Sequence, residues 1–436
     1  MSVAVSIVIF VLKLLLWIIT IWLAAGALHW SVFALIALGR MRSRRCEPRQ
    51  TGAFSYLVMI PGYRMGNELA EAARAVRLAD YDQKLIDTVV IADHCDESVC
   101  RAAEDAGGRV IRLSLERSTK VASMKAAFED ARGGGGTATQ ADAVLILDGD
   151  NLVAPGFFTQ LTAHFRANAD AVQGRRVARN WDTPVAQLDM ISEALNNAVF
   201  RRARVMAGLP CSLIGSAMAF RYSLLERHIM DMQSVGGFDK ELEMRLIAEG
   251  RKIAYAEKAV CFDEKLPDRA AFAQQKRRWL SAQFVYLGRT AGAVARALFT
   301  CRGPAMLDKW LQWLFPPRVL LLMLQPLLAL LICMFMPAPA FILAAGFALM
   351  AVLHAALITR EGLMSVMPSV LMEGFTLTLQ LVGALLRLRG ANRRFIHTPH
   401  EGGVSITEIA RAAAAAPALP AGVLDAIRPL LDDKHE

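Results

Sequence analysis

The chain has 436 residues, of which 55% are hydrophobic and 20% are charged, and its formal net charge is +9. This composition excludes an intrinsically disordered or collagen-like chain, because both classes are much poorer in apolar residues. The apolar residues lie largely in long runs near the two ends, which excludes an ordinary soluble enzyme and predicts membrane segments. The arginines cluster beside these runs without interleaved aromatic residues, so the charge indicates a lipid bilayer as a partner and no nucleic acid.

The first apolar run extends from Val3 to Leu38 and contains one charged residue, Lys13. It exceeds the ~20 residues that one helix needs to cross the hydrocarbon, so we expect a single long, tilted helix. Residues 1–39 are therefore predicted to form a transmembrane anchor, because a cleaved signal peptide would have a shorter apolar core and a small-residue cleavage site. The arginines within 40–49 predict, by the positive-inside rule, that the following residues face the cytoplasm.

Residues 50–290 alternate apolar runs with amphipathic stretches and are predicted to form one globular domain. The runs 55–60, 87–93 and 109–113 are typical of strands, and 68–79 and 99–106 are typical of helices between them. Strands that alternate with helices form a parallel sheet, whose strands are covered on both faces and are therefore continuously apolar. The expected fold class is α/β with a Rossmann-like, mostly parallel sheet.

The C-terminal third is predicted to return to the membrane. Residues 291–317 are expected to contain an amphipathic helix on the membrane surface, and 318–388 contain three apolar segments. The third segment carries Pro368 and Glu373, so we interpret it as interfacial, re-entrant or lining a polar cavity. Residues 389–436 are expected to be a cytoplasmic tail, either mobile or forming a short helical extension.

The sharpest local motif is VLILDGDN at 144–151. An apolar strand here ends in Asp148 and Asp150, which alternation puts on the same side at the carboxyl end, where α/β sheets bind ligands. Two carboxylates can hold a hard divalent cation, Mg²⁺ or Mn²⁺, that bridges a diphosphate. An ordinary acidic turn after a strand is the alternative interpretation.

Further motifs surround this one in a fixed order: SYLVMIPGY at 55–63, DTVVIAD at 87–93, GFDKELEMRL at 237–246 and QQKRRW at 274–279. With them the chain resembles the inverting family-2 glycosyltransferases, in particular the membrane-embedded branch of cellulose, hyaluronan and poly-N-acetylglucosamine synthases. The resemblance implies a GT-A fold for the globular domain.

The resemblance also implies roles for individual residues. The residues implied in donor binding are Pro61, Tyr63, Glu68, Asp93, Lys120, Asp148, Gln275 and Arg278. Asp148 and Asp150 match the metal ligands, and Asp239 matches the general base that acts on the acceptor hydroxyl. Trp279 matches the support for the acceptor sugar, and Gly215 and Ser216 of GSAMAF match an acceptor-side loop.

Several residues have competing interpretations. Glu241 is a rival for the base, because Phe238 precedes Asp239 where the family has a second acidic residue. Asp239 can also be interpreted as a helix N-cap, and Arg278 with Trp279 as a membrane-interface anchor. The charged turn Asp263–Lys265 is expected to be a solvated loop.

The sequence thus predicts a multi-pass protein of the inner (plasma) membrane with a cytoplasmic catalytic domain. It would transfer a sugar from a nucleotide-diphosphate sugar, UDP-linked, to a growing β-linked exopolysaccharide with inversion, and export-complex subunits are expected partners. One alternative is a single-addition transferase with a polyprenyl-linked acceptor. Another is an inactive nucleotide-sugar-binding subunit of an export complex, against which the intact DGD and Asp239 argue.

Overall fold

The computed structural model describes residues 3–39, 52–134, 141–234, 236–386, 405–414 and 423–432. Its strands are β1 (Tyr56–Tyr63), β2 (Ile86–Asp93), β3 (Arg109–Leu113), β4 (Ala143–Ile146), β5 (Leu152–Val153), β6 (Ala171–Ala178), β7 (Met218–Arg221) and β8 (Ile253–Asp263). They form one eight-stranded sheet in the order β3-β2-β1-β4-β7-β6-β8-β5.

The helices of the sheet domain are α2 (Glu68–Arg77), α3 (Glu97–Asp105), α4 (Lys120–Arg132), α5 (Phe157–Arg166), α6 (Pro184–Asn196), α7 (Ala203–Met206), α8 (Tyr222–Asp231), α9 (Phe238–Glu249) and α10 (Arg269–Ala297). The remaining helices are α1 (Val3–Leu38), α11 (Gly303–Leu314), α12 (Arg318–Ile332), α13 (Pro337–Arg360), α14 (Met367–Leu386), α15 (Ile406–Ala414) and α16 (Val423–Asp432). A π-helical turn, Asn197–Arg202, joins α6 to α7.

The first half of the sheet is parallel. Strand β1 pairs in parallel with β2 and β4, and β2 pairs in parallel with β3. Their carboxyl ends meet at one edge, where Tyr63 lies beside Asp93 and the DGDN turn follows β4. This confirms the predicted α/β fold with a mostly parallel sheet. Strand β7 is antiparallel to both of its neighbours, because it is entered from a loop and not from a crossover helix.

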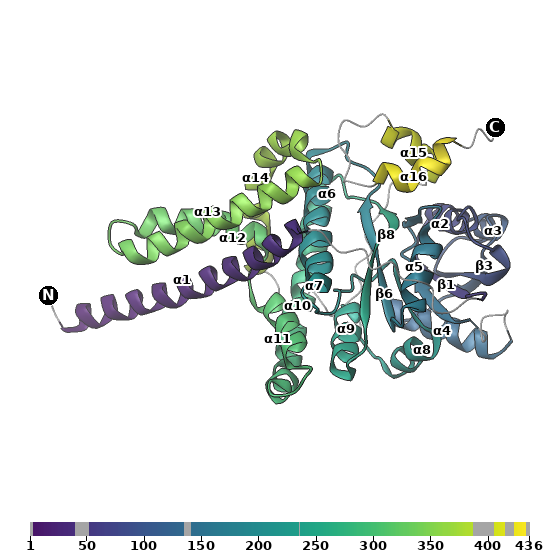
Figure 1. The fold of residues 1–436 in the computed structure, drawn as a ribbon, viewed down its shortest axis with the longest axis horizontal. Coiled ribbons are helices and arrows are strands. Elements are labelled where there is room, and N and C mark those ends of the chain that lie inside the picture. The colour runs from purple at the N-terminus through teal and green to yellow at the C-terminus, as the bar shows by residue number, and fades with distance from the viewer. Residues whose placement is uncertain are drawn as a thin grey trace.

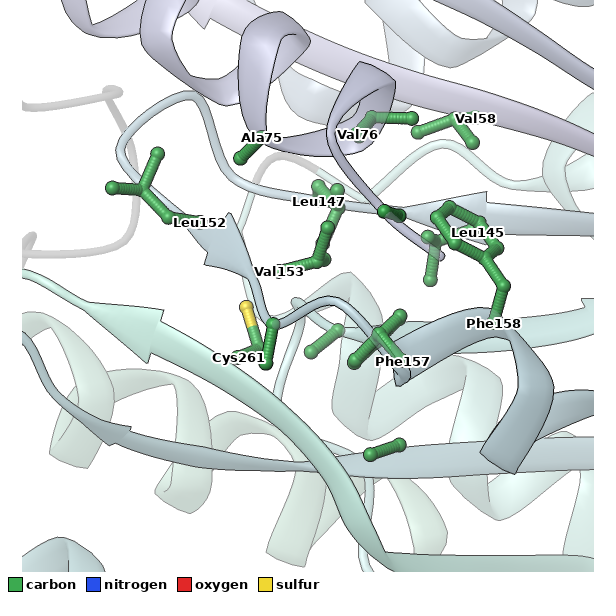
Figure 2. Packing of buried hydrophobic residues seen from close by; sticks show 14 of the residues in the cluster. Val58, Ala75, Val76, Leu145, Leu147, Leu152, Val153, Phe157, Phe158 and Cys261 are labelled. Carbon is green, nitrogen blue, oxygen red and sulfur yellow. The ribbon is translucent and has the colours of Figure 1, made fainter. Parts of the chain in front are cut away.

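Close packing fixes the strand that carries the DGDN turn. Figure 2 shows Val76 of α2 next to Val58 of β1, with Leu145 of β4 and Phe158 of α5 below them. These side chains are almost fully buried. Small residues on α2 allow the helix to lie close to the sheet, so the end of β4 has little freedom to move.

Helices at both ends could cross a membrane, as the sequence predicts. By length and composition, α1 and α13 qualify within the described residues, and α11 with α12 qualifies as a third if this pair, bent by 59°, is counted as one span. Figure 1 shows α1, α12 and α13 extending together away from the sheet. Helix α14 is not among the candidates, and its buried Glu373 pairs with Arg269 at the start of α10.

In its described residues, 405–414 and 423–432, the tail forms two short helices that pack on the sheet domain. Ile406 and Ile409 of α15, with Val423 and Ile427 of α16, are buried in the same apolar cluster as Phe262 of β8. Figure 1 shows this pair of helices beside β8 and α2. The expected short helical extension is therefore helical in its described parts, and its apolar side covers one end of the sheet.

We expect Ile427→Ala to destabilise the sheet domain by about 2–4 kcal/mol, because the side chain is fully buried and its loss leaves a cavity. Leu424→Ala, on the same helix but 46% exposed, is the matched control and should change stability by less than about 0.5 kcal/mol. Thermal unfolding of the purified full chain in detergent measures both. Equal melting temperatures for the two variants would contradict the packing of α16.

Candidate active site

A cavity of about 600 Å³ opens at the carboxyl edge of the sheet and extends to the membrane helices. The predicted site residues that line it are Pro61, Tyr63, Asp93, Lys120, Asp148, Asp150, Gly215, Asp239, Gln275, Arg278 and Trp279. These residues come from β1, β2, α4, the turn after β4, the loop before β7, α9 and α10. The fold therefore brings nearly the whole predicted set around one space.

Glu68 and Ser216 do not line this cavity, and both are buried. The Glu68 carboxylate accepts a hydrogen bond from the Gly66 backbone N–H at 2.9 Å, which holds the turn after β1. The Ser216 hydroxyl accepts one from the Asp148 backbone N–H at 2.8 Å and donates one to Asn151. Both residues thus position turns that carry other site residues.

The DGDN turn presents two carboxylates to the cavity. Asp148 contacts Lys120 at the start of α4, and the Lys120 ammonium also donates to the Gly215 carbonyl at 2.7 Å. Asp150 is buried, and the Asn151 amide donates to its Oδ1 at 3.2 Å. Gly149 lies between them, where a Cβ would come within 2.6 Å of the Met65 sulfur, so a larger residue would require the Met65 and Leu69 side chains to shift.

The donor set of this turn fits Mg²⁺ or Mn²⁺. Such a cation is held by one or two carboxylates together with substrate phosphates and water, and Asp148 and Asp150 would supply the carboxylates. Within the described part of the chain, no group of three His, Cys, Asp or Glu side chains is arranged to hold a metal. The remaining ligands would therefore be oxygens of the substrate and of water.

Asp93 offers a hydrogen-bond acceptor inside the cavity. Its Oδ1 accepts from the Leu115 backbone N–H at 3.1 Å and is 2.8 Å from His94 Nδ1. Its Oδ2 is buried without a hydrogen-bond partner among the described residues. His94, which has no predicted role, has a left-handed backbone with φ of 55° and packs edge-on against Tyr63. A buried acceptor of this kind favours a ligand that donates a hydrogen bond.

The two rival carboxylates of α9 face different surroundings. Asp239 lines the cavity beside Gly215, where a Cβ would lie 3.9 Å from its carboxyl carbon. Glu241 lies outside the cavity and is held by Arg245 at 2.7 Å and by the Tyr286 hydroxyl at 3.1 Å. Gly237, with φ of 72°, is the N-cap of this helix, so Asp239 is not the cap.

Helix α10 contributes Gln275, Arg278 and Trp279 to the lining of the cavity. Burial lowers the pKa of Arg278, and the negative charge of Asp148 opposes that shift, so the two groups are close enough to interact. The Lys276 ammonium bonds Asp189 of α6 at 2.8 Å and lies 4.1 Å from the centre of the Trp279 ring. Trp279 is 38% exposed, which leaves ring surface open to the cavity.

The charged turn at Asp263–Lys265 is buried, so the expectation of a solvated loop is wrong. The Lys265 ammonium, 1% exposed, bonds Asp263 at 2.7 Å and lies 3.6 Å from Asp189. Burial alone would raise the pKa of Asp263, but Arg176 and Lys265 overcome it and lower the pKa. These charges compensate one another across β8, α6 and β6, and the pairing with Asp189 and Arg176 joins segments that are distant in sequence.

The membrane end of the cavity was not predicted from the sequence. There Trp30 of α1 and Phe200 of the π-helical turn line the cavity together with Phe315, Arg318 and Leu320. The Trp30 indole N–H donates to the Pro316 carbonyl at 3.3 Å, which joins α1 to the bend between α11 and α12. The site is therefore continuous with the interface between the membrane helices.

Comparisons with known proteins found two similar solved structures that bear on this chain. A mannosyltransferase from Pyrobaculum calidifontis, solved in complex with GDP-Man and Mn²⁺, matches with a TM-score of 0.50 and 17% identity, over 84% of this chain and 98% of that chain. A glucosyl-3-phosphoglycerate synthase from Mycobacterium tuberculosis, solved with Mn²⁺, UDP and phosphoglyceric acid, matches with a TM-score of 0.37 and 16% identity, over 53% of this chain and 78% of that chain. No curated protein matches.

The first of these likenesses supports the GT-A fold that the sequence predicts. The family model described as "Glycosyltransferase like family 2" matches residues 53–282, which is just over half of the chain and includes every motif from the first turn to Trp279. The chain therefore belongs to glycosyltransferase family 2.

Proposed function

We propose that this glycosyltransferase transfers a sugar from a nucleotide-diphosphate sugar, with uridine as the nucleoside, to an acceptor hydroxyl with inversion. The acceptor is a growing β-linked exopolysaccharide, as in the synthase branch that the motifs resemble. The observation that carries the proposal is that the DGDN turn, Asp239 and Trp279 line one continuous cavity. A donor site, a base and an apolar platform are the parts that this reaction needs.

The donor would lie between the carboxyl edge of the sheet and α10. The free Oδ2 of Asp93 can accept a hydrogen bond from the base or the ribose, beside Tyr63 and Pro61. Gln275, Arg278 and Lys120 provide donors for the diphosphate. A divalent cation held by Asp148 and Asp150 would add positive charge where the leaving diphosphate becomes more negative.

Asp239 is the proposed general base. It accepts the proton of the acceptor hydroxyl, whose oxygen forms a bond to the anomeric carbon as the bond from that carbon to the diphosphate oxygen breaks. The nucleoside diphosphate leaves with the bonding electrons. A single displacement of this kind inverts the anomeric configuration, and it needs one base and no second carboxylate as a nucleophile.

We expect Trp279→Ala to lower transfer to the acceptor at least about tenfold while donor hydrolysis changes little, because a sugar stacks its C–H groups on an indole face. Trp279→Phe retains a ring and should recover much of the activity. Nucleoside diphosphate release with and without acceptor measures both variants. Equal losses in the two assays, or normal transfer by Trp279→Ala, would contradict the acceptor role.

The number of membrane helices favours a second candidate acceptor. Two helices, or up to three, could cross a membrane within the described residues, which is few for a polymer channel. The cavity instead reaches the side chains of α1 and α12, where a lipid-linked acceptor could enter from the bilayer. Single addition to a polyprenyl-linked acceptor is therefore the second candidate.

In either case we propose a multi-pass protein of the inner membrane. Its catalytic domain lies in the cytoplasm, where nucleotide sugars are made. For the polymerising enzyme we also propose export-complex subunits as partners.

The product distinguishes the two acceptors. Membranes containing the chain would be incubated with radiolabelled UDP-glucose or UDP-GlcNAc and Mg²⁺ or Mn²⁺, and the product separated by size. A ladder or high polymer supports polysaccharide synthesis, and one added sugar on a lipid supports the second candidate. No transfer from any nucleotide sugar, with Asp148→Asn membranes equal to wild type, would contradict both.

A further inference from the structure

Arg318 is a buried cation at the membrane end of the cavity. It is 9% exposed, follows two prolines at the bend between α11 and α12, and lines the cavity. Its Nη2 donates to Asn196 and, at 3.4 Å, to the Ser192 carbonyl. Its Nη1 is buried without a hydrogen-bond partner among the described residues. The guanidinium thus has donor capacity left over inside the cavity.

Every other buried arginine among the described residues has a carboxylate partner. The nearest pairs are Arg175 with Glu361 at 3.0 Å, Arg176 with Glu193 at 3.1 Å, Arg179 with Glu264 at 3.0 Å, Arg201 with Glu193 at 2.8 Å, Arg202 with Glu361 at 2.8 Å and Arg204 with Asp308 at 3.4 Å. No carboxylate in the described part of the chain forms an ion pair with Arg318, and the two oxygens of Glu193 in the cavity wall are each taken by another arginine. A buried guanidinium without an anion is unfavourable, so this position favours an anionic ligand.

The surroundings of Arg318 indicate what that anion is attached to. Trp30 of α1 and Val319 and Leu320 of α12 line the cavity at this end, together with the polar Ser192 and Asn196 that Arg318 bonds. Helix α12 continues with Leu324 and Leu327 exposed at 37% and 49%, on a helix pair that could cross the membrane. An anion bound here would therefore have its apolar continuation along α1 and α12, in the bilayer.

We infer that Arg318 binds the phosphate of a lipid-linked acceptor, whose lipid chain leaves the cavity along α1 and α12. The glycan or hydroxyl end of the same molecule would extend toward Trp279 and Asp239, which line the same cavity. This inference rests on the proposed function and specifies its acceptor class. It also reconciles the two candidate acceptors, because a growing glycan can itself be carried on a lipid phosphate.

The test uses the purified full chain in non-ionic detergent and compares ligands that differ in one feature. Farnesyl phosphate carries both a lipid chain and a phosphate, farnesol lacks the phosphate, and inorganic phosphate lacks the chain. We expect wild-type protein to bind farnesyl phosphate at least about tenfold more tightly than either of the others. This comparison needs no variant, so it remains decisive if a substitution at Arg318 impairs folding.

Variants then assign the phosphate to Arg318. Arg318→Gln should weaken farnesyl phosphate binding at least about tenfold and leave farnesol binding unchanged, and Arg318→Lys should retain part of the affinity. Arg296→Gln removes the same charge from an exposed position on α10 outside the cavity and is the matched control, expected to bind as wild type. The inference would be overturned if wild-type protein bound farnesol as tightly as farnesyl phosphate. It would also be overturned if Arg318→Gln and Arg296→Gln lost affinity for farnesyl phosphate equally.

Two further outcomes would also overturn it. Inorganic phosphate binding as tightly as farnesyl phosphate would indicate a site for a free anion, and equal competition by dioleoyl phosphatidylglycerol would indicate bulk anionic lipid. Release of nucleoside diphosphate from a nucleotide sugar is measured separately on the same preparation. If release occurs without any preference for the lipid phosphate, the inference fails and the proposed function stands. If the lipid phosphate binds but no nucleotide sugar is used, the proposed function fails.

Discussion

Asp239→Asn is expected to lower sugar transfer by about 10²- to 10⁴-fold while the affinity for nucleoside diphosphate stays within about twofold of wild type. The amide has nearly the same shape as the carboxylate but cannot accept the hydroxyl proton. Asp239 lines the cavity on the first turn of α9, with Lys240 as its nearest cation at 3.7 Å. Steady-state transfer and equilibrium nucleotide binding by purified protein measure the two properties.

Glu241→Gln is the matched control, because it removes a carboxylate from the same helix two residues away. Glu241 bonds Arg245 and Tyr286 outside the cavity, so we expect transfer to fall by less than about tenfold, through packing alone. A larger loss in Glu241→Gln than in Asp239→Asn would transfer the base role to Glu241. If Asp239→Asn lowered nucleotide affinity by as large a factor as it lowered transfer, this carboxylate would act on the donor.

Asp150→Asn is expected to weaken nucleotide binding in Mn²⁺ or Mg²⁺ at least about tenfold and to abolish transfer. The substitution keeps the shape of a side chain that is buried against Asn151 and removes one of the two negative charges on the DGDN turn. A hard divalent cation depends on such charge, so the loss should appear only when the cation is present.

Nucleotide affinity would be titrated for wild type and Asp150→Asn, each with excess Mn²⁺ and each with EDTA. Asp105→Asn, an exposed carboxylate on α3, removes the same charge away from the cavity and should bind as wild type in both buffers. The two curves for wild type and Asp150→Asn should coincide in EDTA. A deficit of Asp150→Asn that persists in EDTA would contradict the metal role and indicate damage to the turn.

Residues at the carboxyl ends of parallel strands were predictable from the sequence. Tyr63, Asp93 and Asp148 each follow a continuously apolar run, and strands that alternate with helices must bring such ends to one edge. Their proximity therefore follows from the local pattern and from the rules for βαβ units. The family resemblance added Asp239 and the residues of α10, which lie too far along the chain for any spacing rule.

The interior charges could not be predicted in the same way. Lys265 looks like a surface lysine in sequence, and the approach of α6 gives it Asp189 as a partner in addition to its sequence neighbour Asp263. In sequence, Arg318 flanks an apolar helix, as the positive-inside rule expects. In the structure its guanidinium bonds Ser192 and Asn196 of α6, more than 100 residues earlier in the chain. Contacts between distant segments leave no local signal.

The central claim is that the cavity is a single site for sugar transfer from a nucleotide-diphosphate donor. The most direct measurement is release of nucleoside diphosphate by the purified full chain, screened over UDP- and GDP-sugars with Mn²⁺ or Mg²⁺, for wild type and Asp148→Asn. We predict release from at least one donor, dependent on the cation and lost in Asp148→Asn. No release from any donor, or release that is equal in the two proteins, would contradict the claim.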